Sequence, residues 1–460
     1  MPDASLRDRT ATLLTEDEAF GHIAAAGFHP AGASDSPSAP SLIGAEVEWL
    51  VTGAADRRRR VDPESVKAML AVRDALPRCT RLSFEPGGAL ELSTNPAPTV
   101  RECFDDLEAD RARVTAALGD QRLELVGLGL DPVRLPRRVL RTPRYQAMEE
   151  LFDQDGRAGR WMMANTASVQ VCLDIASNNI APNGTIPKGK APNDKAPKSK
   201  ALKDKAPSDT VPNSDGRNDT GLAERWELAH RLAPVLIAAF ANSPLRRGEP
   251  SLWRSTRQHV WAAIDHTRSR PVLQGAAVQG DPRESWARYA LDARVMAIRG
   301  PGRWTVPRGL TFRDWLRSNT LRRPTLDDLD YHLSTLFPPV RPRGSYLELR
   351  MIDAQPGRDW VVPVAVAAAL FDDPAASAVA SAALEPLWRN ARTADLYLRA
   401  ATSALRDGPI AKAAAACFAA ARDAQPDPEI AGLVDDFAEA FVNRGRTRAD
   451  DLVDGGPRRT

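Results

Sequence analysis

Glutamates at alternate positions of strand-like segments are the residues best suited to chemistry in this chain. Glu46 and Glu48 form a Glu-x-Glu pair in LIGAEVEWLV, and Glu91 lies in ALELS, just after the Pro-Gly-Gly turn that follows Glu85. Side chains at positions i and i+2 of a strand point to the same face and lie about 6.5–7 Å apart. Glu46 and Glu48 can therefore bracket a cation.

Two more segments repeat this alternation. SYLELRMID alternates Glu348 and Arg350 with apolar residues, and ASVQVCLDI alternates Gln170, Cys172 and Asp174 with valine and leucine. For any one strand the simpler interpretation is a half-exposed sheet whose polar side is solvated. Four such strands, each with an apolar side for covering helices and a polar side with few basic residues, favour a functional site instead.

Clustered carboxylates repel one another, and a hard cation such as Mg²⁺ relieves that repulsion by binding their oxygens at about 2.0–2.1 Å. Magnesium usually completes its coordination shell with water and substrate phosphates, so phosphate chemistry is expected. The sequence has no GxxxxGK[ST] loop, and GLGL at 127–130 falls short of GxGxxG. A nucleotide would have to be held through metal ions and arginines.

The elements that must position these residues indicate an α+β fold. Thr15 and Glu18 have capping-box spacing, which predicts a first helix. Alternation of polar and apolar residues predicts strands, whereas a 3.6-residue period predicts helices. The predicted strands cover 42–51, 89–93, 123–131, 168–174 and 345–353, and the predicted helices cover 63–76, 99–118, 145–153, 222–241, 283–298 and most of 363–446.

The composition predicts a single catalytic domain over 1–460. Of its 460 residues 43% are hydrophobic, so most of the chain can bury a core. A Lys/Pro/Ala-rich stretch at 176–221 is the exception: it contains no aromatic residue, and we expect a disordered insertion there. Its lysines could form a nucleic-acid-binding arm, but interspersed acidic residues and the lack of stacking aromatics favour a solvated linker.

The net charge, the cysteines and the terminal sequences limit where the protein is expected to be located and what it is expected to bind. A formal net charge of +2 offers no global field for nucleic acid or an anionic membrane, so neither partner is expected. The four cysteines are far apart, with no CxxC, which favours a reducing compartment. No signal peptide or membrane span is evident, and a cytoplasmic protein is expected. The sequence does not fix the oligomeric state, although we favour a monomer.

Six motifs resemble, in order, those of glutamate–cysteine ligases of the actinobacterial type, with plant enzymes as more distant cousins. This resemblance implies a glutamine-synthetase-like fold, in which a curved antiparallel sheet forms the metal and ATP cavity and helices cover its outer face. It also implies ATP-dependent joining of L-glutamate to L-cysteine through γ-glutamyl phosphate, with ATP and Mg²⁺ required, and a place in ergothioneine synthesis. The motifs are IGAEVEWLV, FEPGGALELST, MMANTASVQVCLDI, FANSP, RSTRQHVWAAIDHTR and PTLDDLDYHLSTLFPPVRPRGSYLELRMID.

The resemblance also implies roles for individual residues. Arg257 matches an arginine that binds a carboxylate of the amino-acid substrate, and Arg350 matches one that meets the transferred phosphate; both are therefore expected to be catalytic. Gln170 matches a polar residue that faces the metals and would bind the cofactor together with Arg350. Asn165 occupies a substrate-binding position where the plant enzymes carry arginine, so part of that clamp is replaced or missing. The implied metal ligands are Glu46, Glu48, Glu85, Glu91 and Glu348.

Histidines and cysteines are weighed separately. Asp265, His266 and Arg268 in AIDHTR are expected to line the substrate site, whereas His259 and His332 are expected to be structural. We assign no nucleophile, since metal ions and arginines suffice for phosphoryl transfer. Cys172 and Cys79 are expected to be small core residues rather than catalytic thiols.

Two alternatives remain open at this stage. The first is a related ligase that joins glutamate to a different amine, because no sequence signature of a cysteine pocket can be recognised. The second is a catalytically silent scaffold with the same fold. Retention of Glu46, Glu48, Glu91 and Glu348 argues against a scaffold, because unpaired buried carboxylates are costly to keep.

Overall fold

The computed structural model describes residues 14–28, 41–175, 216–273, 280–389 and 391–455. A seven-stranded sheet lies at its centre, in the order β2-β3-β1-β5-β9-β8, and β4 pairs with the far end of β1. All of these pairs are antiparallel. The strands are β1 (Ile43–Gly53), β2 (Thr80–Phe84), β3 (Leu90–Thr94), β4 (Leu123–Val126), β5 (Ser168–Asp174), β8 (Val340–Pro342) and β9 (Tyr346–Asp353), with a separate two-stranded hairpin of β6 (Leu245–Arg246) and β7 (Glu249–Pro250).

Helices make up most of the remaining described chain, and many begin with a side-chain cap. The capping box predicted at Thr15 is present, since Thr15 accepts from the Glu18 backbone and the Glu18 side chain bonds back. The helices are α1 (Glu16–Gly27), α2 (Pro63–Val72), α3 (Val100–Gly119), α4 (Pro143–Asp153), α5 (Ala158–Asn165), α6 (Gly216–Ala239), α7 (Thr256–Ala262), α8 (His266–Ser269), α9 (Pro282–Asp292), α10 (Phe312–Arg317), α11 (Leu326–Leu333), α12 (Val361–Asp372), α13 (Pro374–Trp388), α14 (Thr393–Thr402), α15 (Gly408–Asp423), α16 (Pro428–Ala440) and α17 (Arg448–Asp454).

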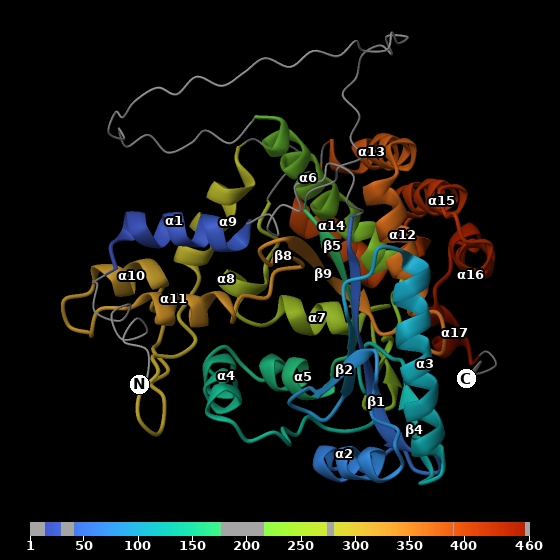
Figure 1. The fold of residues 1–460 in the computed structure, drawn as a ribbon, viewed down its shortest axis with the longest axis horizontal. Helices are drawn as coiled ribbons and strands as arrows, with labels where there is room; N and C mark the ends of the chain where they lie inside the picture. The colour runs from blue at the N-terminus through green and yellow to red at the C-terminus, as the bar shows by residue number, and fades with distance from the viewer. Residues whose placement is uncertain (1–13, 29–40, 176–215, 274–279, 390, 456–460) are drawn as a thin grey trace, which may run out of the picture.

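One face of the sheet is apolar and covered by helices. Val47, Trp49, Leu92, Val171 and Leu349 all point to this side and are at most 1% exposed. Helices α3, α6 and α12 contact the strands here, and Figure 1 shows α3, α12, α15 and α16 on this side. Burial of this continuous apolar layer supplies most of the driving force for folding.

The opposite face carries the polar residues of the same strands. Because side chains alternate along a strand, Glu46 and Glu48 must lie on the face opposite Val47 and Trp49. Register then aligns polar residues across the sheet: Glu48 pairs with Glu91 of β3, and Glu46 pairs with Gln170 of β5. Figure 1 shows α4, α5 and α7 on this side. The predicted α+β class, an antiparallel sheet with helices on its apolar face, is confirmed.

Three predicted boundaries are corrected by the structure. The strand expected over 123–131 ends at Val126, because the chain then passes tightly against the end of β9: a Cβ on Gly127 would lie 2.2 Å from the Gln355 carbonyl oxygen. The helix expected over 283–298 ends at Asp292, since the following residues form β-bridges with the 305–311 segment.

The third correction concerns the predicted insertion over 176–221. Helix α6 already begins at Gly216, so the predicted end of the insertion is too late. The part over 176–215 lies outside the described residues, and its disorder remains a prediction.

Among the described residues, no single helix is both long and apolar enough to cross a membrane. Helices α12 and α13 meet that length and composition only as a pair, and the chain bends by 100° at the break between them.

Candidate functional site

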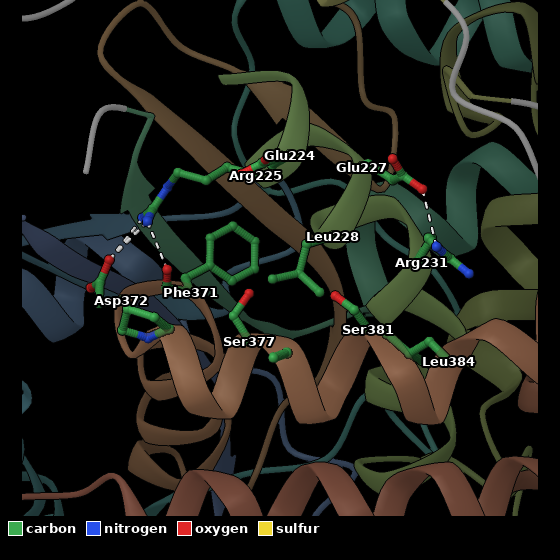
Figure 2. Close-up of a pocket in the computed structure, with 12 residues that line it drawn as sticks. Glu224, Arg225, Glu227, Leu228, Arg231, Phe371, Asp372, Ser377, Ser381 and Leu384 are labelled. Carbon is green, nitrogen blue, oxygen red and sulfur yellow. Dashed lines mark hydrogen bonds and ion pairs between the residues drawn. The ribbon is translucent and has the colours of Figure 1, made fainter. Parts of the chain in front are cut away.

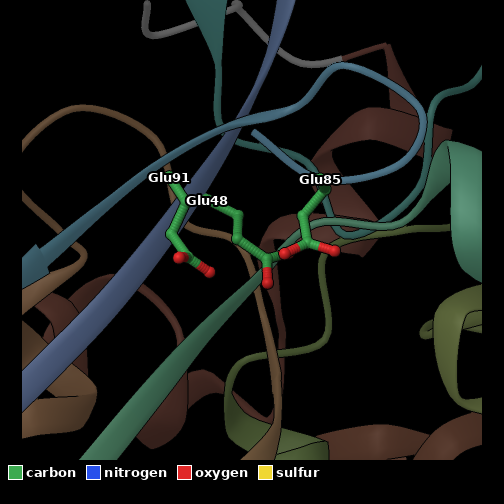
Figure 3. Close-up of side chains that lie close together, drawn as sticks. All are labelled: Glu48, Glu85 and Glu91. Atoms are coloured by element: carbon green, nitrogen blue, oxygen red, sulfur yellow. The ribbon is translucent and has the colours of Figure 1, made fainter. Parts of the chain in front are cut away.

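Three of the predicted metal ligands come together on the polar face. One carboxylate oxygen each from Glu48, Glu85 and Glu91 lies within 4.8 Å of the other two, a group we call the glutamate trio. Figure 3 shows the three carboxylates directed toward one another, Glu48 and Glu91 from adjacent strands and Glu85 from the preceding turn. Carboxylate oxygens at this spacing can share one hard divalent cation.

The Glu-Pro-Gly-Gly turn places Glu85 in the trio. The Glu85 backbone N–H donates to the Ala89 carbonyl at 2.9 Å, and Gly88 adopts a φ of 92°, which favours glycine. Gly87 packs against helix α5, where an added Cβ would lie 2.1 Å from the Ala164 carbonyl oxygen. The two glycines therefore let the turn bend sharply and approach α5 closely enough to present Glu85.

Hydrogen bonds hold two members of the trio in place. Glu48 accepts from the Ser168 backbone N–H at 2.9 Å and from the Gln170 side-chain amide at 3.2 Å. Glu91 accepts from the Ser83 hydroxyl at 2.6 Å. None of these donors carries a charge, so the negative charge of the trio stays largely uncompensated.

This lack of compensation appears in the pKa values. Burial, reinforced by neighbouring carboxylates, raises the pKa of both Glu46 and Glu48 to about 7 and raises the pKa of Glu85 well above its usual range. Protonated carboxyls at neutral pH would release their protons when a cation binds, because metal ligands must be deprotonated. The donor set and its charge thus fit a magnesium ion.

Glu348 has a different environment from the trio. Arg341 donates from Nε to Glu348 Oε2 at 2.7 Å and from Nη2 to Oε1 at 3.0 Å, while Arg350 also bonds to Oε1. Although burial alone raises its pKa, Arg341, Arg350 and Arg343 together lower the pKa of Glu348 to about 2. Glu348 is not part of the trio. Both Glu348 and Glu91 raise the pKa of Glu46, so Glu46 lies between Glu348 and the trio.

Arg341 is the charged residue of this face that sequence reasoning missed. It is 8% exposed and lies opposite Glu348 in the β8–β9 hairpin. The available signal was the RPRGS turn, in which Gly344 has a φ of 75°. A hairpin closed at that turn brings Arg341 beside Glu348 on the same face. The strand β8 is only three residues long, too short for its alternation to be recognised.

Arg350 and Gln170 connect Glu348 to the glutamate trio. Arg350 Nη1 donates to the side-chain oxygen of Gln170, and the Gln170 amide in turn donates to Glu48. A chain of hydrogen bonds therefore runs from Glu348 through Arg350 and Gln170 to the trio. The predicted cofactor-binding pair lies together, although its role remains a proposal.

Arg257 is held next to Arg350 and keeps N–H donors that have no partner among the described residues. It is 3% exposed, its Nη2 donates to the Arg350 carbonyl at 2.8 Å, and its Nη1 lies 3.8 Å from Asp353 Oδ1. Within the described chain, its Nε and Nη1 have no hydrogen-bond partner. Burial lowers the pKa of Arg257, but the group stays protonated in the usual pH range. A buried guanidinium with unmet donors is suited to bind an anion.

Two of the sequence motifs hold Asp353 in place, and Asp353 lies beside Arg257. The Asp353 carboxylate accepts from the Asn242 backbone at 2.9 Å, from the Ser243 hydroxyl at 2.7 Å and from the Ser255 hydroxyl at 2.9 Å. The FANSP and RSTRQ motifs, which are separate in sequence, therefore converge on one buried carboxylate beside Arg257. This convergence gives a structural reason for both motifs.

Asp265 and Arg268 do not join the site. Arg268 is 0% exposed, donates from Nε to Asp265 Oδ2 at 3.0 Å and from Nη1 to the Thr335 carbonyl at 2.8 Å. Asp265 is also paired with a second arginine, since its Oδ1 lies 3.0 Å from Arg294 Nη2. The prediction that Asp265 and Arg268 bind substrate is therefore replaced by a structural role, because their polar atoms are used within the fold. His332 is also structural, with Nε2 bonded to the Ala290 carbonyl at 2.8 Å.

Asn165 and Cys172 both have their surroundings described by the structure. Asn165 is 1% exposed and donates to the Arg134 carbonyl at 2.7 Å, which ties the end of α5 to the loop after β4. Its side-chain oxygen has no partner among the described residues. Cys172 lies opposite Glu348 on the polar face, and burial raises the pKa of its thiol well above the usual value. A neutral thiol there is inert, in agreement with our assigning no nucleophile.

A cavity of about 350 Å³ lies between α6 and the α12–α13 corner (Figure 2). Four of its five charged residues are paired within the fold, since Arg225 bonds to Asp372 at 2.9 Å and Arg231 bonds to Glu227 at 3.1 Å. These helices belong to the apolar side of the sheet, away from the glutamate trio. This cavity is therefore not the candidate site.

Comparison with known proteins agrees with this geometry. The family model for glutamate–cysteine ligase family 2 (GCS2) matches residues 42–183 and 210–456. The glutamate–cysteine ligase EgtA of Mycolicibacterium smegmatis is 37% identical over 96% of this chain and 92% of its own length. A chloroplastic glutamate–cysteine ligase A of Oryza sativa subsp. japonica is 28% identical over 64% of this chain and 52% of its own length.

Among solved structures, the glutamate–cysteine ligase of Francisella tularensis in complex with AMP superposes with a TM-score of 0.46 at 11% identity, covering 91% of this chain and 85% of that one. The match to the family model spans most of the chain. The chain therefore belongs to glutamate–cysteine ligase family 2.

Proposed function

We propose that this protein is an ATP-dependent glutamate–cysteine ligase that forms γ-glutamylcysteine through a γ-glutamyl phosphate. Family membership supports the activity, and the glutamate trio beside Arg350 supports a site on the polar face of the sheet. The observation that carries the assignment is the combination of the glutamate trio with Arg350 of β9, which Gln170 of the intervening strand β5 links to Glu48. Supply of γ-glutamylcysteine for ergothioneine is the cellular role we favour.

Mg²⁺ would be held by Glu48, Glu85 and Glu91, with Glu46, two residues before Glu48 on β1, as a further candidate ligand. When bound, it would neutralise phosphate charge and orient the nucleotide. Glu348 serves differently, since its charge is already balanced by Arg341 and Arg350. We therefore assign Glu348 the task of holding Arg350 in place, in addition to any contact with a cation.

The reaction requires two successive nucleophilic displacements. A side-chain carboxylate oxygen of glutamate attacks the γ-phosphorus of ATP, ADP leaves, and an acyl phosphate forms. The amine nitrogen of cysteine then attacks the acyl carbon, phosphate leaves with the former carboxylate oxygen, and the nitrogen loses a proton. Phosphoryl transfer asks a protein mainly to position groups and stabilise charge. We assign Arg350 to bind the transferred phosphate, and no covalent nucleophile is needed.

Arg257 would bind a carboxylate of glutamate. Its Nε and Nη1 have no hydrogen-bond partner among the described residues, and each can donate a charged hydrogen bond to a substrate oxygen. Its bond to the Arg350 carbonyl keeps the two arginines at a fixed separation. Glutamate held by Arg257 would thus present its other carboxylate toward Arg350.

The test is phosphate release from ATP with Mg²⁺, glutamate and a panel of amines. Cysteine should give the highest kcat/KM, with γ-glutamylcysteine, ADP and phosphate formed in equal amounts. A different amine preferred over cysteine would identify the related carboxylate–amine ligase. No glutamate-dependent phosphate release with any amine would identify a silent scaffold.

A further inference from the structure

Two loops at the surface of the protein concentrate positive charge. The loop over 54–62 joins β1 to α2, and the segment over 131–141 belongs to the connection between β4 and α4. Together they contain eight arginines and three aspartates, with no lysine and no glutamate. The formal net charge of the whole chain is only +2, so this excess of five positive charges is a local feature of the surface.

Most of these arginines lack a carboxylate partner. Three of the eight form ion pairs with carboxylates of the fold, namely Arg57, Arg134 and Arg138. Two of the three aspartates bind backbone groups instead, since Asp56 and Asp62 each accept from a backbone N–H at 2.9 Å. The other five arginines are exposed and form no ion pair among the described residues: Arg58, Arg59, Arg60, Arg137 and Arg141.

The two loops are held against each other. Arg60 donates from Nη2 to the Leu135 carbonyl, and Arg134 donates from Nη1 to the Arg59 carbonyl at 3.5 Å. Burial, and then the like charges of Arg134 and Arg137, lower the pKa of Arg60. Guanidinium groups of the two loops therefore lie close enough to repel one another, and an anion bound between them would relieve that repulsion.

We propose that Arg59, Arg60 and Arg137, which we call the arginine surface, bind an anion that carries several linked phosphates. A guanidinium can donate two parallel hydrogen bonds to one phosphate group. Because every phosphate of such a chain is charged, a single ligand can contact both loops at once. This binding site goes beyond the proposed ligase activity and does not depend on it.

Two other kinds of polyanion fit this surface less well. The carboxylates of an acidic peptide sit on flexible side chains, and ordering several of them costs conformational entropy. Single-stranded nucleic acid usually gains affinity by stacking its bases on aromatic rings, and neither loop contains an aromatic residue. A short phosphate chain needs neither ordered side chains nor stacking.

The arginine surface adjoins the turn of the glutamate trio but faces away from it. The backbone N–H groups of Val139 and Leu140 donate to the Pro86 carbonyl of that turn at 2.7 and 3.2 Å. A Cβ on Gly88 would lie 3.4 Å from both Pro63 Cγ and Val139 Cγ2. Backbone and apolar groups therefore contact the turn, while the three arginines are exposed to solvent.

Calorimetric titration of the whole chain with tripolyphosphate tests the proposal. The buffer is freed of divalent cations, so that no metal can join the ligand to the glutamate trio. Wild type should bind one tripolyphosphate, and more weakly as salt is added, because exposed charges are screened. Inorganic phosphate should bind roughly tenfold more weakly or worse, since it cannot contact both loops. Absence of tripolyphosphate binding at low salt overturns the proposal.

A matched pair of double variants tests the location. The variant R59Q/R137Q should weaken tripolyphosphate binding roughly tenfold or more, and it should fold normally because neither side chain makes a described hydrogen bond. The control R308Q/R444Q removes the same charge from two other exposed arginines that form no described ion pair, and it should bind like wild type. Wild-type affinity in R59Q/R137Q places the ligand elsewhere and contradicts the proposal. Equal losses in both variants mean that only net charge matters, which contradicts it as well.

Competing ligands test the chemistry of the anion. Oligoglutamate and oligothymidylate with the same number of charges should each bind wild type more weakly than tripolyphosphate. Tighter binding of oligoglutamate would identify a surface for an acidic protein segment, and tighter binding of oligothymidylate would identify one for nucleic acid. Either result contradicts the assignment of a phosphate chain.

Discussion

The carboxylates of the polar face differ in what surrounds each of them. Glu348 lies between arginines and has a pKa of about 2, so it stays charged. Glu48 receives only uncharged donors, and burial raises its pKa to about 7. A cation therefore gains more from Glu48 than from Glu348, since the charge of Glu348 is already balanced.

Glu48→Gln should abolish ligase activity while leaving the fold intact. The substitution keeps the shape of the side chain but removes one charge from the trio, so Mg²⁺ should bind at least tenfold more weakly. Calorimetric titration with Mg²⁺ and phosphate release measure both effects. Glu64→Gln, at an exposed position of α2, is the matched control and should match wild type. Near-normal turnover of Glu48→Gln at saturating Mg²⁺ would show that the trio is not the metal site.

Arg257→Lys should raise the KM for glutamate strongly and change the KM for ATP little. Lysine keeps the charge but cannot make the paired hydrogen bonds of a guanidinium. Because Arg257 also bonds to the Arg350 carbonyl, thermal unfolding should be followed in parallel. Arg58→Lys, at an exposed position, serves as the control. A glutamate KM equal to wild type means that Arg257 only supports β9.

Sequence reasoning placed single residues well where their strand alternation was clear. Glu46, Glu48, Glu91, Gln170 and Arg350 lie on one face, as predicted, because alternation has a period of two. It could not show that Asp265 and Arg268 satisfy each other, since a buried ion pair depends on how α8 packs. It also missed Arg341, whose partner is set by hairpin register rather than by local pattern.

At the scale of elements, the turn between β2 and β3 is the part of the site most sensitive to side-chain volume. Gly87 leaves no room for a Cβ against Ala164 of α5. Gly87→Ala should push the turn away from α5 and move Glu85 out of the trio. We expect weaker Mg²⁺ binding and a loss of stability of about 1–3 kcal/mol, typical of overpacking.

The control for this change is Gly21→Ala in helix α1, where an added Cβ meets no atom within 4 Å. That variant should gain up to about 1 kcal/mol of stability, because alanine favours a helix over glycine, and its Mg²⁺ binding should stay unchanged. Mg²⁺ affinity equal to wild type in Gly87→Ala would mean that Glu85 is not required for the cation.

Most helices and strands could be predicted from the sequence, but their first and last residues were predicted less accurately. Strands β1, β3, β5 and β9 and helices α3 and α4 occupy the predicted segments, since their periodicity is strong. Strand β4 ends early for a reason outside its own sequence, namely the close approach of Gly127 and Gly129 to the end of β9. Local patterns cannot report such contacts between distant segments.

At the scale of the whole molecule, the raised pKa values link stability to pH and to Mg²⁺. The pKa of Glu46 and Glu48 rises from 4.5 to about 7 on folding, so between these values the folded protein holds protons that the unfolded chain has released. Without metal, these groups make the free energy of unfolding fall as pH rises through that window.

Mg²⁺ should reverse this trend, because it binds the deprotonated folded form. Thermal unfolding at pH 5.5 and pH 8, each with and without Mg²⁺, measures the effect. The melting temperature should rise more with Mg²⁺ at pH 8 than at pH 5.5, and Glu48→Gln should reduce the difference. An equal rise at both pH values would contradict a carboxylate site with these pKa values.

The central claim is that the polar face activates a carboxylate of glutamate by transferring phosphate to it. The most direct measurement follows oxygen-18 from the side-chain carboxylate of labelled glutamate during turnover with ATP, Mg²⁺ and cysteine. Because the amine displaces phosphate from the acyl carbon, each phosphate released should carry one labelled oxygen, in step with γ-glutamylcysteine. Unlabelled phosphate would mean that water, not glutamate, accepts the phosphoryl group, and would contradict the account.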